Sequence, residues 1–130
     1  MIIEVIAIDE PVKKFKTLVR KKAKALSHLL GRRGAIDIYI VSGQRMKHLN
    51  QEFRNKNTST NVLSFPKPDN FPGLKLGEVF LDPVYIQKHK EDLVLMLVHG
   101  VLHILGYDHL RKGDRIKMEK MENRLLKKMV

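Results

Sequence analysis

Three histidines lie at a spacing that suits a metal ion: His99, His103 and His109. Residues four apart on an α-helix differ by roughly 40° in rotation and 6 Å in rise, so His99 and His103 would present their imidazoles side by side. His109 would lie on the far side of a continuing helix, but Gly106 can adopt the left-handed conformation that ends a helix and turns the chain back. The third imidazole can then converge on the same ion.

An ion held by three imidazoles alone keeps one coordination position open. In a tetrahedral site that position takes a water molecule, which is typical of a catalytic zinc ion, and zinc can lower the pKa of such a water to about 7. Zinc is therefore the expected divalent ion, although imidazole ligands leave cobalt, nickel and manganese open. The chain has no cysteine, which excludes thiolate ligands and disulfides.

For a histidine taken singly, a packed core position or a surface position would be the ordinary expectation. Two imidazoles within the apolar stretch from Leu93 to Leu105 would find no hydrogen-bond partners among its leucines and valines, so a metal accounts for them better. The remaining histidines lack such spacing, and we expect them on the surface: His28, His48 and His89.

The histidine spacing is also that of the long zinc motif of metzincin proteases, His-x3-His-x2-Gly-x2-His, with one difference. Those proteases carry a glutamate directly after the first histidine, where this chain has Gly100. That glutamate is the general base that handles the proton of the attacking water. Its absence therefore argues against peptide hydrolysis by this route.

Positive charge dominates the chain and is concentrated near its start. The formal net charge is +11, and residues 11–36 hold nine Lys or Arg and no acid. Because basic side chains displace counterions from a phosphate backbone, the segment favours a nucleic-acid partner, although a solvated face that keeps the protein soluble is the plainer alternative. The candidate RNA contacts are Lys13, Lys14, Lys16, Arg20, Lys21, Lys24, Arg32 and Arg33.

Neither a signal peptide nor a membrane span is expected. Residues 1–10 lack a basic start and carry Glu4 within the apolar run. The apolar stretch from Leu93 to Leu105 falls short of the roughly 20 residues that cross a bilayer. We therefore expect a cytoplasmic protein without a membrane partner.

The hydrophobic pattern predicts four strands and about five helices in one domain spanning residues 1–130. The expected strands, short and rich in β-branched residues, are 2–8, 35–41, 62–65 and 78–81. Apolar residues at helical spacing, with capping residues at several starts, predict helices at 12–30, 42–54, 82–89, 92–105 and from about 113 onward. Residues 66–77 hold three of the five prolines and are expected to form a surface loop near the site.

Two of the expected helices carry candidate site residues. The second has Met46, Leu49 and Phe53 on one face and leaves Arg54 at or just beyond its end, free to project. The fourth is apolar at nearly every position, so we expect it to be buried on all sides and to end at Gly106.

Two segments resemble the YbeY family of bacterial rRNA-maturation endoribonucleases. The family signature His-Gly-x-Leu-His-x-x-Gly-Tyr-Asp-His is present at every fixed position in residues 99–109. Residues 49–54 match Leu-Asn-x-x-Phe-Arg, and residues 60–66 resemble Thr-Asp-Val-Leu-Ser-Phe-Pro. Asn61, Asn57 and Glu78 depart from family aspartates, so the roles of those carboxylates do not carry over.

The resemblance implies a fold, a substrate and a cofactor. The fold would be a single α+β domain with a small mixed four-stranded sheet, about five helices and a central buried helix that carries the metal ligands. The three histidines would hold one divalent metal, most simply Zn²⁺. The activity would be single-strand-directed cleavage of ribosomal RNA in 16S 3′-end maturation and late ribosome quality control, with small ribosomal subunit proteins as further candidate partners.

Arg54 and Asp108 are the candidate catalytic residues beside the metal. The planar fork of Arg54 suits a scissile phosphate, whereas a helix cap or a surface ion pair is its structural alternative. Asp108 could act as a base, could orient an imidazole, or could cap the turn after Gly106. No residue obviously replaces the missing glutamate, although metal-bound hydroxide or attack by the RNA's own 2′-hydroxyl would need none.

Two other functions remain open at this point. One is a non-catalytic ribosome-assembly or RNA-binding factor that keeps the metal for stability. The other is a metal-dependent hydrolase of peptides or other small substrates, which the glycine at position 100 disfavours.

Overall fold

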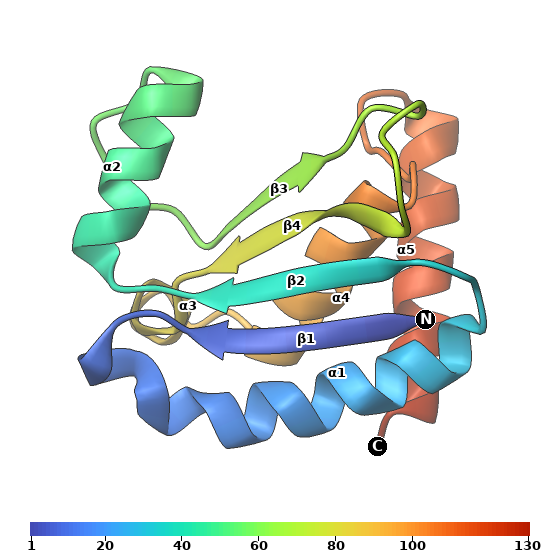
Figure 1. Ribbon diagram of the computed structural model, residues 1–130, viewed down its shortest axis with the longest axis horizontal. Helices are drawn as coiled ribbons and strands as arrows, with labels where there is room; N and C mark the ends of the chain where they lie inside the picture. The colour runs from blue at the N-terminus through green and yellow to red at the C-terminus, as the bar shows by residue number, and fades with distance from the viewer.

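Four strands form one mixed sheet in the order β1-β2-β4-β3 in the computed structural model, which describes residues 1–130 (Figure 1). The strands are β1 (Ile2–Ala7), β2 (Ala35–Ile40), β3 (Val62–Pro66) and β4 (Lys75–Leu81). β1, β2 and β4 run parallel, and β3 is antiparallel to β4. Consequently β1 and β3 are the two edges, and each keeps one side free of strand pairing.

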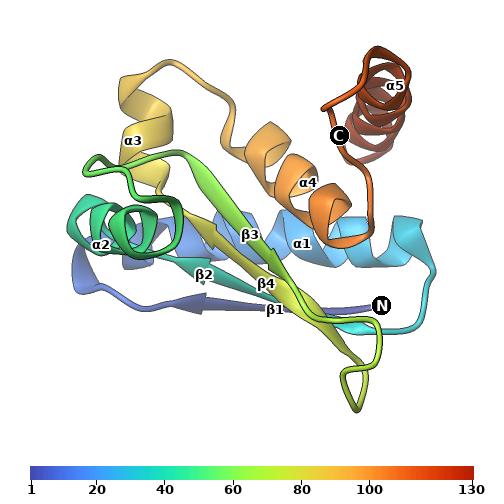
Figure 2. The same ribbon diagram turned by 90° about the horizontal axis from the view of Figure 1, so that it is seen from above.

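The helices gather largely on one side of this sheet (Figure 2). They are the 3-10 helix η1 (Glu10–Phe15) and the α-helices α1 (Lys16–Leu30), α2 (Gly43–Arg54), α3 (Pro83–Lys88), α4 (Leu93–Ile104) and α5 (Lys112–Lys128). α1 and α4 pack against the sheet, and α5 packs outside α4. α2 extends from the end of β2 toward β3 (Figure 1). None of the helices is long and apolar enough to cross a membrane.

Alternation along β2 sets which face of the sheet is buried. Ile36, Ile38 and Ile40 are fully buried on the face toward α1 and α4, whereas Asp37 and Tyr39 lie on the opposite face. Successive side chains of a strand point to opposite faces, so this pattern also fixes the register of the sheet.

Side-chain caps start several helices where the sequence predicts them. The Ser42 hydroxyl accepts a hydrogen bond from the Arg45 N–H, and Asp82 and Asp92 cap α3 and α4 in the same way. These caps satisfy backbone donors that have no partner inside the helix, which fixes the helix starts. Gly31, with φ 59°, ends α1 after Leu30, the predicted last residue of this helix.

α4 is the centre of the core, as predicted. None of its residues is fully exposed, and Leu97, Val98, Val101 and Leu102 are at most 1% exposed. Met118 and Leu125 of α5, and Met129 just after its end, pack onto the same cluster. A helix buried this completely holds its polar side chains in fixed positions.

Two element boundaries differ by more than one residue from the sequence prediction and bear on the fold. The first helix begins with the 3-10 turn η1 and becomes α-helical only at Lys16. β4 begins at Lys75, so the loop is shorter than residues 66–77. Gly77 therefore lies inside this strand and not in the loop. A Cβ at this position would be 2.7 Å from both Ile104 Cδ1 and the Phe65 carbonyl oxygen, so the close packing explains why the residue is glycine. A glycine that indicated a loop is therefore a close-packing position.

Candidate metal centre

The last two turns of α4 and the loop after it bring three imidazoles together. The Nε2 atoms of His99 and His103 are 3.0 Å apart. α4 then ends in a pair of hydrogen bonds, from Gly106 N–H to His103 O and from Tyr107 N–H to Leu102 O, with Gly106 at φ 99°. This is the Schellman arrangement, which turns the chain back. It brings His109 close enough that one nitrogen from each histidine lies within 4.8 Å of the others.

The donor set fits a divalent transition metal. A tetrahedral zinc ion with Zn–N bonds of ~2.0–2.1 Å requires its nitrogen ligands to lie about 3.3 Å apart, close to the His99–His103 separation. Burial, with the nearby His99 and His109, lowers the pKa of His103 below its ordinary value. The neutral form that a metal ligand requires is therefore favoured. The three histidines could hold one ion.

Glu122 joins this centre from α5, and the sequence alone did not indicate it. Its side chain is only 11% exposed, and its Oε2 lies 2.7 Å from Nδ1 of His99. A carboxylate that accepts the Nδ1–H leaves the Nε2 lone pair of His99 directed toward the other imidazoles. The available signal was an acid within an otherwise apolar stripe, between Met118 and Leu125.

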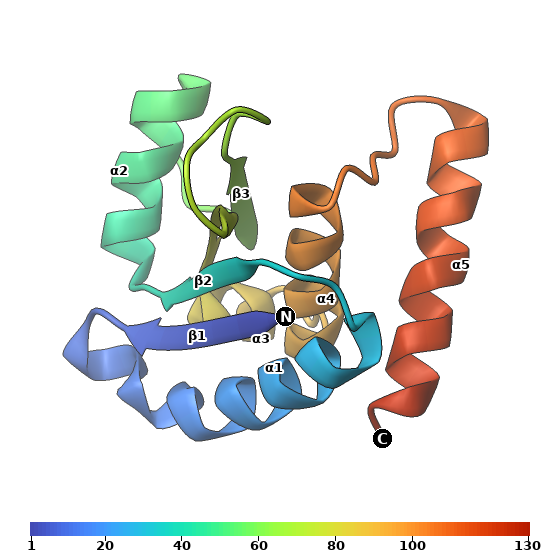
Figure 3. The same ribbon diagram turned by 45° about the vertical axis from the view of Figure 1, so that its right-hand side comes forward.

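One cavity of about 440 Å³ joins the histidines to Arg54. Its walls are the end of α2, residues 61–66 along β3, and the three histidines. Figure 3 shows β3 between α2 and α4. Arg54 is the last residue of α2, which ends because Asn55 adopts φ 57°. The guanidinium makes neither a hydrogen bond nor an ion pair within the chain, and no Asp or Glu lines the cavity.

Comparison with known proteins matches this arrangement to one family. The family model described as "Endoribonuclease YbeY" matches residues 4–130. The chain belongs to the YbeY family. It is 36% identical to the endoribonuclease YbeY of Neorickettsia sennetsu, with 95% of each chain covered. It is 37% identical to that of Thermodesulfovibrio yellowstonii, with 84% of this chain and 77% of the relative covered.

A solved structure supports the fold independently. The solution structure of a Thermotoga maritima protein superposes with a TM-score of 0.61 at 22% sequence identity, over 98% of this chain and 89% of that one. Both the YbeY assignment and the predicted α+β architecture, with its mixed four-stranded sheet, are thereby confirmed.

Gly100 explains how this chain differs from the metzincin pattern. A Cβ at position 100 would lie 2.7 Å from Val79 Cγ1 and 3.0 Å from Val62 Cγ2, because this side of α4 packs on the sheet. The Ser64 hydroxyl also donates to the Gly100 carbonyl oxygen at 3.0 Å. There is no room here for the side chain of a protease glutamate.

Asp108 lies in the loop that carries His109. Its Oδ1 accepts a hydrogen bond from the Leu110 N–H at 2.9 Å, so it caps the turn, one of its three expected roles. The imidazole-orienting contact comes from Glu122 instead.

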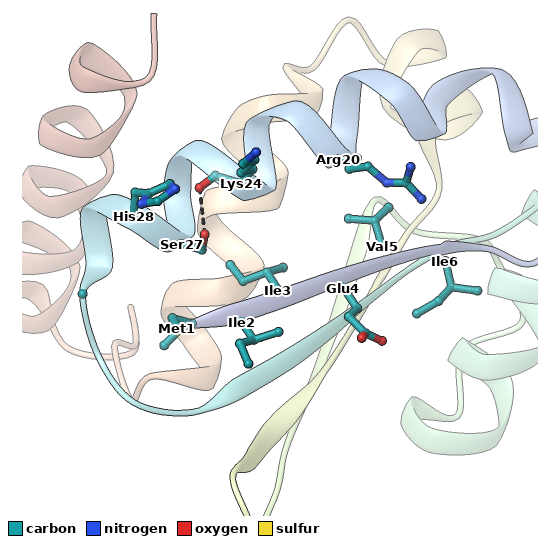
Figure 4. A pocket seen from close by; sticks show the side chains of 11 residues that line it. Met1, Ile2, Ile3, Glu4, Val5, Ile6, Arg20, Lys24, Ser27 and His28 are labelled. Carbon is teal, nitrogen blue, oxygen red and sulfur yellow. Dashed lines mark hydrogen bonds between the residues drawn. The ribbon is translucent and has the colours of Figure 1, made fainter.

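The basic residues near the start of the chain do not enter the histidine cavity. α1 packs against β1, at the opposite edge of the sheet from β3. Arg20 and Lys24 line a separate groove along β1, where they lie across from Ile3 and Val5 (Figure 4). Lys13 pairs with Glu10 at 2.6 Å. The other candidates are at least partly exposed: Lys14, Lys16, Lys21, Arg32 and Arg33. Arg32 follows α1 and lies beside Leu105, at the end of α4.

The remaining polar residues singled out from the sequence are not metal-ligand candidates, although Asn61 lines the histidine cavity. His28, His48 and His89 are exposed, as expected. The Asn61 amide, where the YbeY pattern has aspartate, donates to Glu91 at 3.2 Å. Glu78 pairs with Lys67.

Proposed function

We propose that this chain is a metal-dependent endoribonuclease that cuts single-stranded ribosomal RNA in the cytoplasm, in 16S 3′-end maturation and late ribosome quality control. Membership of the YbeY endoribonuclease family supports RNA cleavage. The observation that carries the proposal is the shared cavity, in which three convergent imidazoles and the unpaired Arg54 lie together and whose lining includes no Asp or Glu. Such a cavity is complementary to a phosphodiester.

His99, His103 and His109 would hold the ion, and zinc is the first candidate. When bound, a divalent metal supplies Lewis acidity toward a phosphoryl oxygen or a water molecule. Glu122 accepts the Nδ1–H of His99, which fixes the tautomer and the direction of the ring. The short turn at Gly106 holds His109 in reach.

Arg54 would bind the scissile phosphate. A guanidinium donates two parallel hydrogen bonds to phosphate oxygens and stabilises the negative charge that builds in the transition state. Arg54 has no internal partner to give up when it does so. The absence of acids from the cavity lining avoids repulsion of the substrate.

The first role of Asp108 is to order the loop that carries His109. Its hydrogen bond to the Leu110 N–H orders the segment that presents His109. The second carboxylate oxygen keeps its lone pairs, so Asp108 stays a candidate for accepting a proton in the reaction.

The test is cleavage of single-stranded RNA that covers the 3′ end of precursor 16S rRNA, with and without a chelator. We expect cleavage that the chelator abolishes, and a loss of 100-fold or more in Arg54→Ala, because one electrostatic contact in a transition state contributes about 10²–10³ to the rate. Arg124→Ala is the matched control, because Arg124 lines a different cavity. Chelator-resistant cleavage that survives Arg54→Ala would overturn the proposal.

A purely structural metal predicts a different result. In a ribosome-assembly factor without catalytic activity, His103→Ala would lower the melting temperature while RNA processing continued whenever the protein stayed folded. In the proposed endoribonuclease, His103→Ala abolishes cleavage even at temperatures where circular dichroism shows a folded chain.

A further inference from the structure

Phe53 is an aromatic residue that the fold leaves in solvent. It continues the face of α2 that begins with Met46, which is fully buried, yet Phe53 itself is 58% exposed. The helix therefore ends with a large apolar ring outside the core. It directly precedes Arg54, and both residues line the cavity that holds the three histidines.

A row of aromatic rings fixes the position of Phe53. Its ring centroid lies 5.1 Å from that of Phe65, with the planes tilted by 60°. Phe65 meets Phe80 edge-on at 5.7 Å, and Phe80 stacks on Tyr39 at 5.0 Å. The rings of Phe65, Phe80 and Tyr39 are partly buried. The Phe53 ring therefore packs against an ordered neighbour while much of its own surface stays accessible to solvent.

The free edge of β3 separates this ring from the histidines. Phe65 lies on the α2 side of the strand, whereas Val62 and Ser64 point toward Gly100 of α4. The cavity includes residues from both sides of the strand. A polymer bound across this edge can therefore place a charged group at the histidines and Arg54 and an adjacent flat group against Phe53.

We propose that Phe53 is the stacking platform for a nucleobase next to the phosphate held by Arg54. This inference rests on the proposed function. Nucleobases are flat and stack on aromatic side chains, and the cavity presents a cation and no carboxylate, as a polyanion requires. A base inside a duplex is already stacked and paired, so this contact favours single-stranded RNA.

An extended peptide is the competing occupant, because the free edge of β3 could pair with a strand. A cavity lining without acidic side chains avoids repulsion of a polyanion, but it gives a peptide no comparable advantage. In addition, Gly100 leaves no room for the glutamate that a metalloprotease uses as its base. The observations therefore favour the nucleobase, and peptide binding becomes one outcome of the experiment.

The test combines a protein change with a substrate change. Phe53→Leu keeps an apolar side chain against Phe65 but removes the aromatic face, and Phe53→Trp restores it. Single-stranded RNAs carry one abasic nucleotide at each position around the cleavage site. Stacking is worth ~1–3 kcal/mol per base, so we expect Phe53→Leu to raise KM about 5- to 150-fold while kcat changes little.

The decisive readout is the coupling between the two changes. With the wild-type protein, one abasic position should raise KM by a similar factor, and Phe53→Leu should be insensitive to that same position. Phe53→Trp should recover both the KM and the sensitivity. Phe71→Leu is the control, since Phe71 is 42% exposed and lines another cavity.

The outcomes separate the platform from the activity. If wild-type protein cleaves RNA and Phe53→Leu retains the wild-type response to every abasic position, the platform is refuted and the proposed function stands. The platform is also refuted if KM rises without coupling to any position, because the role of Phe53 is then structural. If wild-type protein cleaves no RNA but cuts an unstructured peptide, the endoribonuclease proposal and the platform are both wrong.

Discussion

The candidate ligands show how much a single imidazole depends on its neighbours. His99 receives its direction from Glu122, which lies 23 positions later in the chain. His109 reaches the other two only because Gly106 accepts φ 99°, and Asp108 then holds the loop through the Leu110 N–H. We therefore expect the affinity of this candidate site for a metal ion to depend on residues that do not touch the ion.

Glu122→Gln tests that dependence. Glutamine keeps the size of the side chain, and its carbonyl oxygen can still accept the His99 Nδ1–H, but the negative charge that strengthens this hydrogen bond is removed. We expect metal affinity to fall about 10-fold, the lower end of the loss that follows when the partner of a ligating histidine is removed. Competition for Zn²⁺ against a colorimetric chelator measures the change.

Glu119→Gln is the matched control, because Glu119 lies on the same helix but is exposed. It should bind the metal as tightly as the unmodified chain. Equal affinities in Glu122→Gln and Glu119→Gln would show that the charge of Glu122 does not strengthen metal binding.

At the scale of the helices and strands, the site depends on how closely α4 approaches the sheet. α4 contacts β3 and β4 at Gly100, and β4 in turn contacts Ile104 of α4 at Gly77. A small residue on each side lets the backbones lie close. The histidines, on the neighbouring face of α4, then come to rest beside the edge strand β3.

Gly100→Ala should disturb this approach. Alanine favours a helix over glycine by about 1 kcal/mol, but its Cβ would lie 2.7 Å from Val79 Cγ1, and Val79 is fully buried. Overpacking costs about 1–3 kcal/mol, and subtracting the gain leaves an expected net loss of up to about 2 kcal/mol in unfolding free energy. Urea denaturation measures it.

The control substitution is Gly113→Ala in α5, where an added Cβ would meet nothing within 4 Å. There the helix propensity acts alone, and stability should stay the same or rise by up to about 1 kcal/mol. If Gly100→Ala were as stable as Gly113→Ala, the close approach of α4 to the sheet would not constrain that position.

Local patterns predicted the elements well, and tertiary contacts account for what they missed. Ser42, Asp82 and Asp92 indicated helix starts because a cap acts within its own turn. Glu122 and the accessible ring of Phe53 were missed, since their surroundings come from α4 and β3. The three histidines were found together because the turn that joins them lies within eleven residues.

Across the whole molecule, the groove lined by Arg20 and Lys24 and the candidate site are spatially separate. These two residues of α1 lie along the β1 edge, and the histidine cavity, with Arg54, lies along the β3 edge. An RNA that contacted both would have to pass around or across the sheet. The α1 contacts would then add salt-dependent affinity without reaching the reacting phosphate.

An ion pair just beyond the end of β1 ties this edge of the sheet to α2. The Asp9 carboxylate accepts hydrogen bonds from the Ser42 N–H at 2.9 Å and from the Arg45 guanidinium at 3.0 Å. The Arg45 contact, the largest cause, lowers the pKa of Asp9 from 3.8 to about 2. The link holds the start of α2 and thereby helps to place Arg54 at the other end of that helix.

The acid stability of the whole chain should report this link. A carboxyl whose pKa is lower in the folded state stabilises the fold above its unfolded pKa of 3.8, and this contribution disappears as the pH falls toward about 2. The shift corresponds to at most roughly 2.5 kcal/mol, and screening by solvent around the half-exposed Arg45 reduces the expected value to about 1 kcal/mol. Asp9→Asn should therefore be about 1 kcal/mol less stable than the unmodified chain at pH 7, and the two stabilities should converge near pH 2.

Urea denaturation between pH 2 and 7 measures the difference, with Arg45→Ala as the partner variant in a double-mutant cycle. A difference that stayed constant across this range would show that the ion pair does not stabilise the fold.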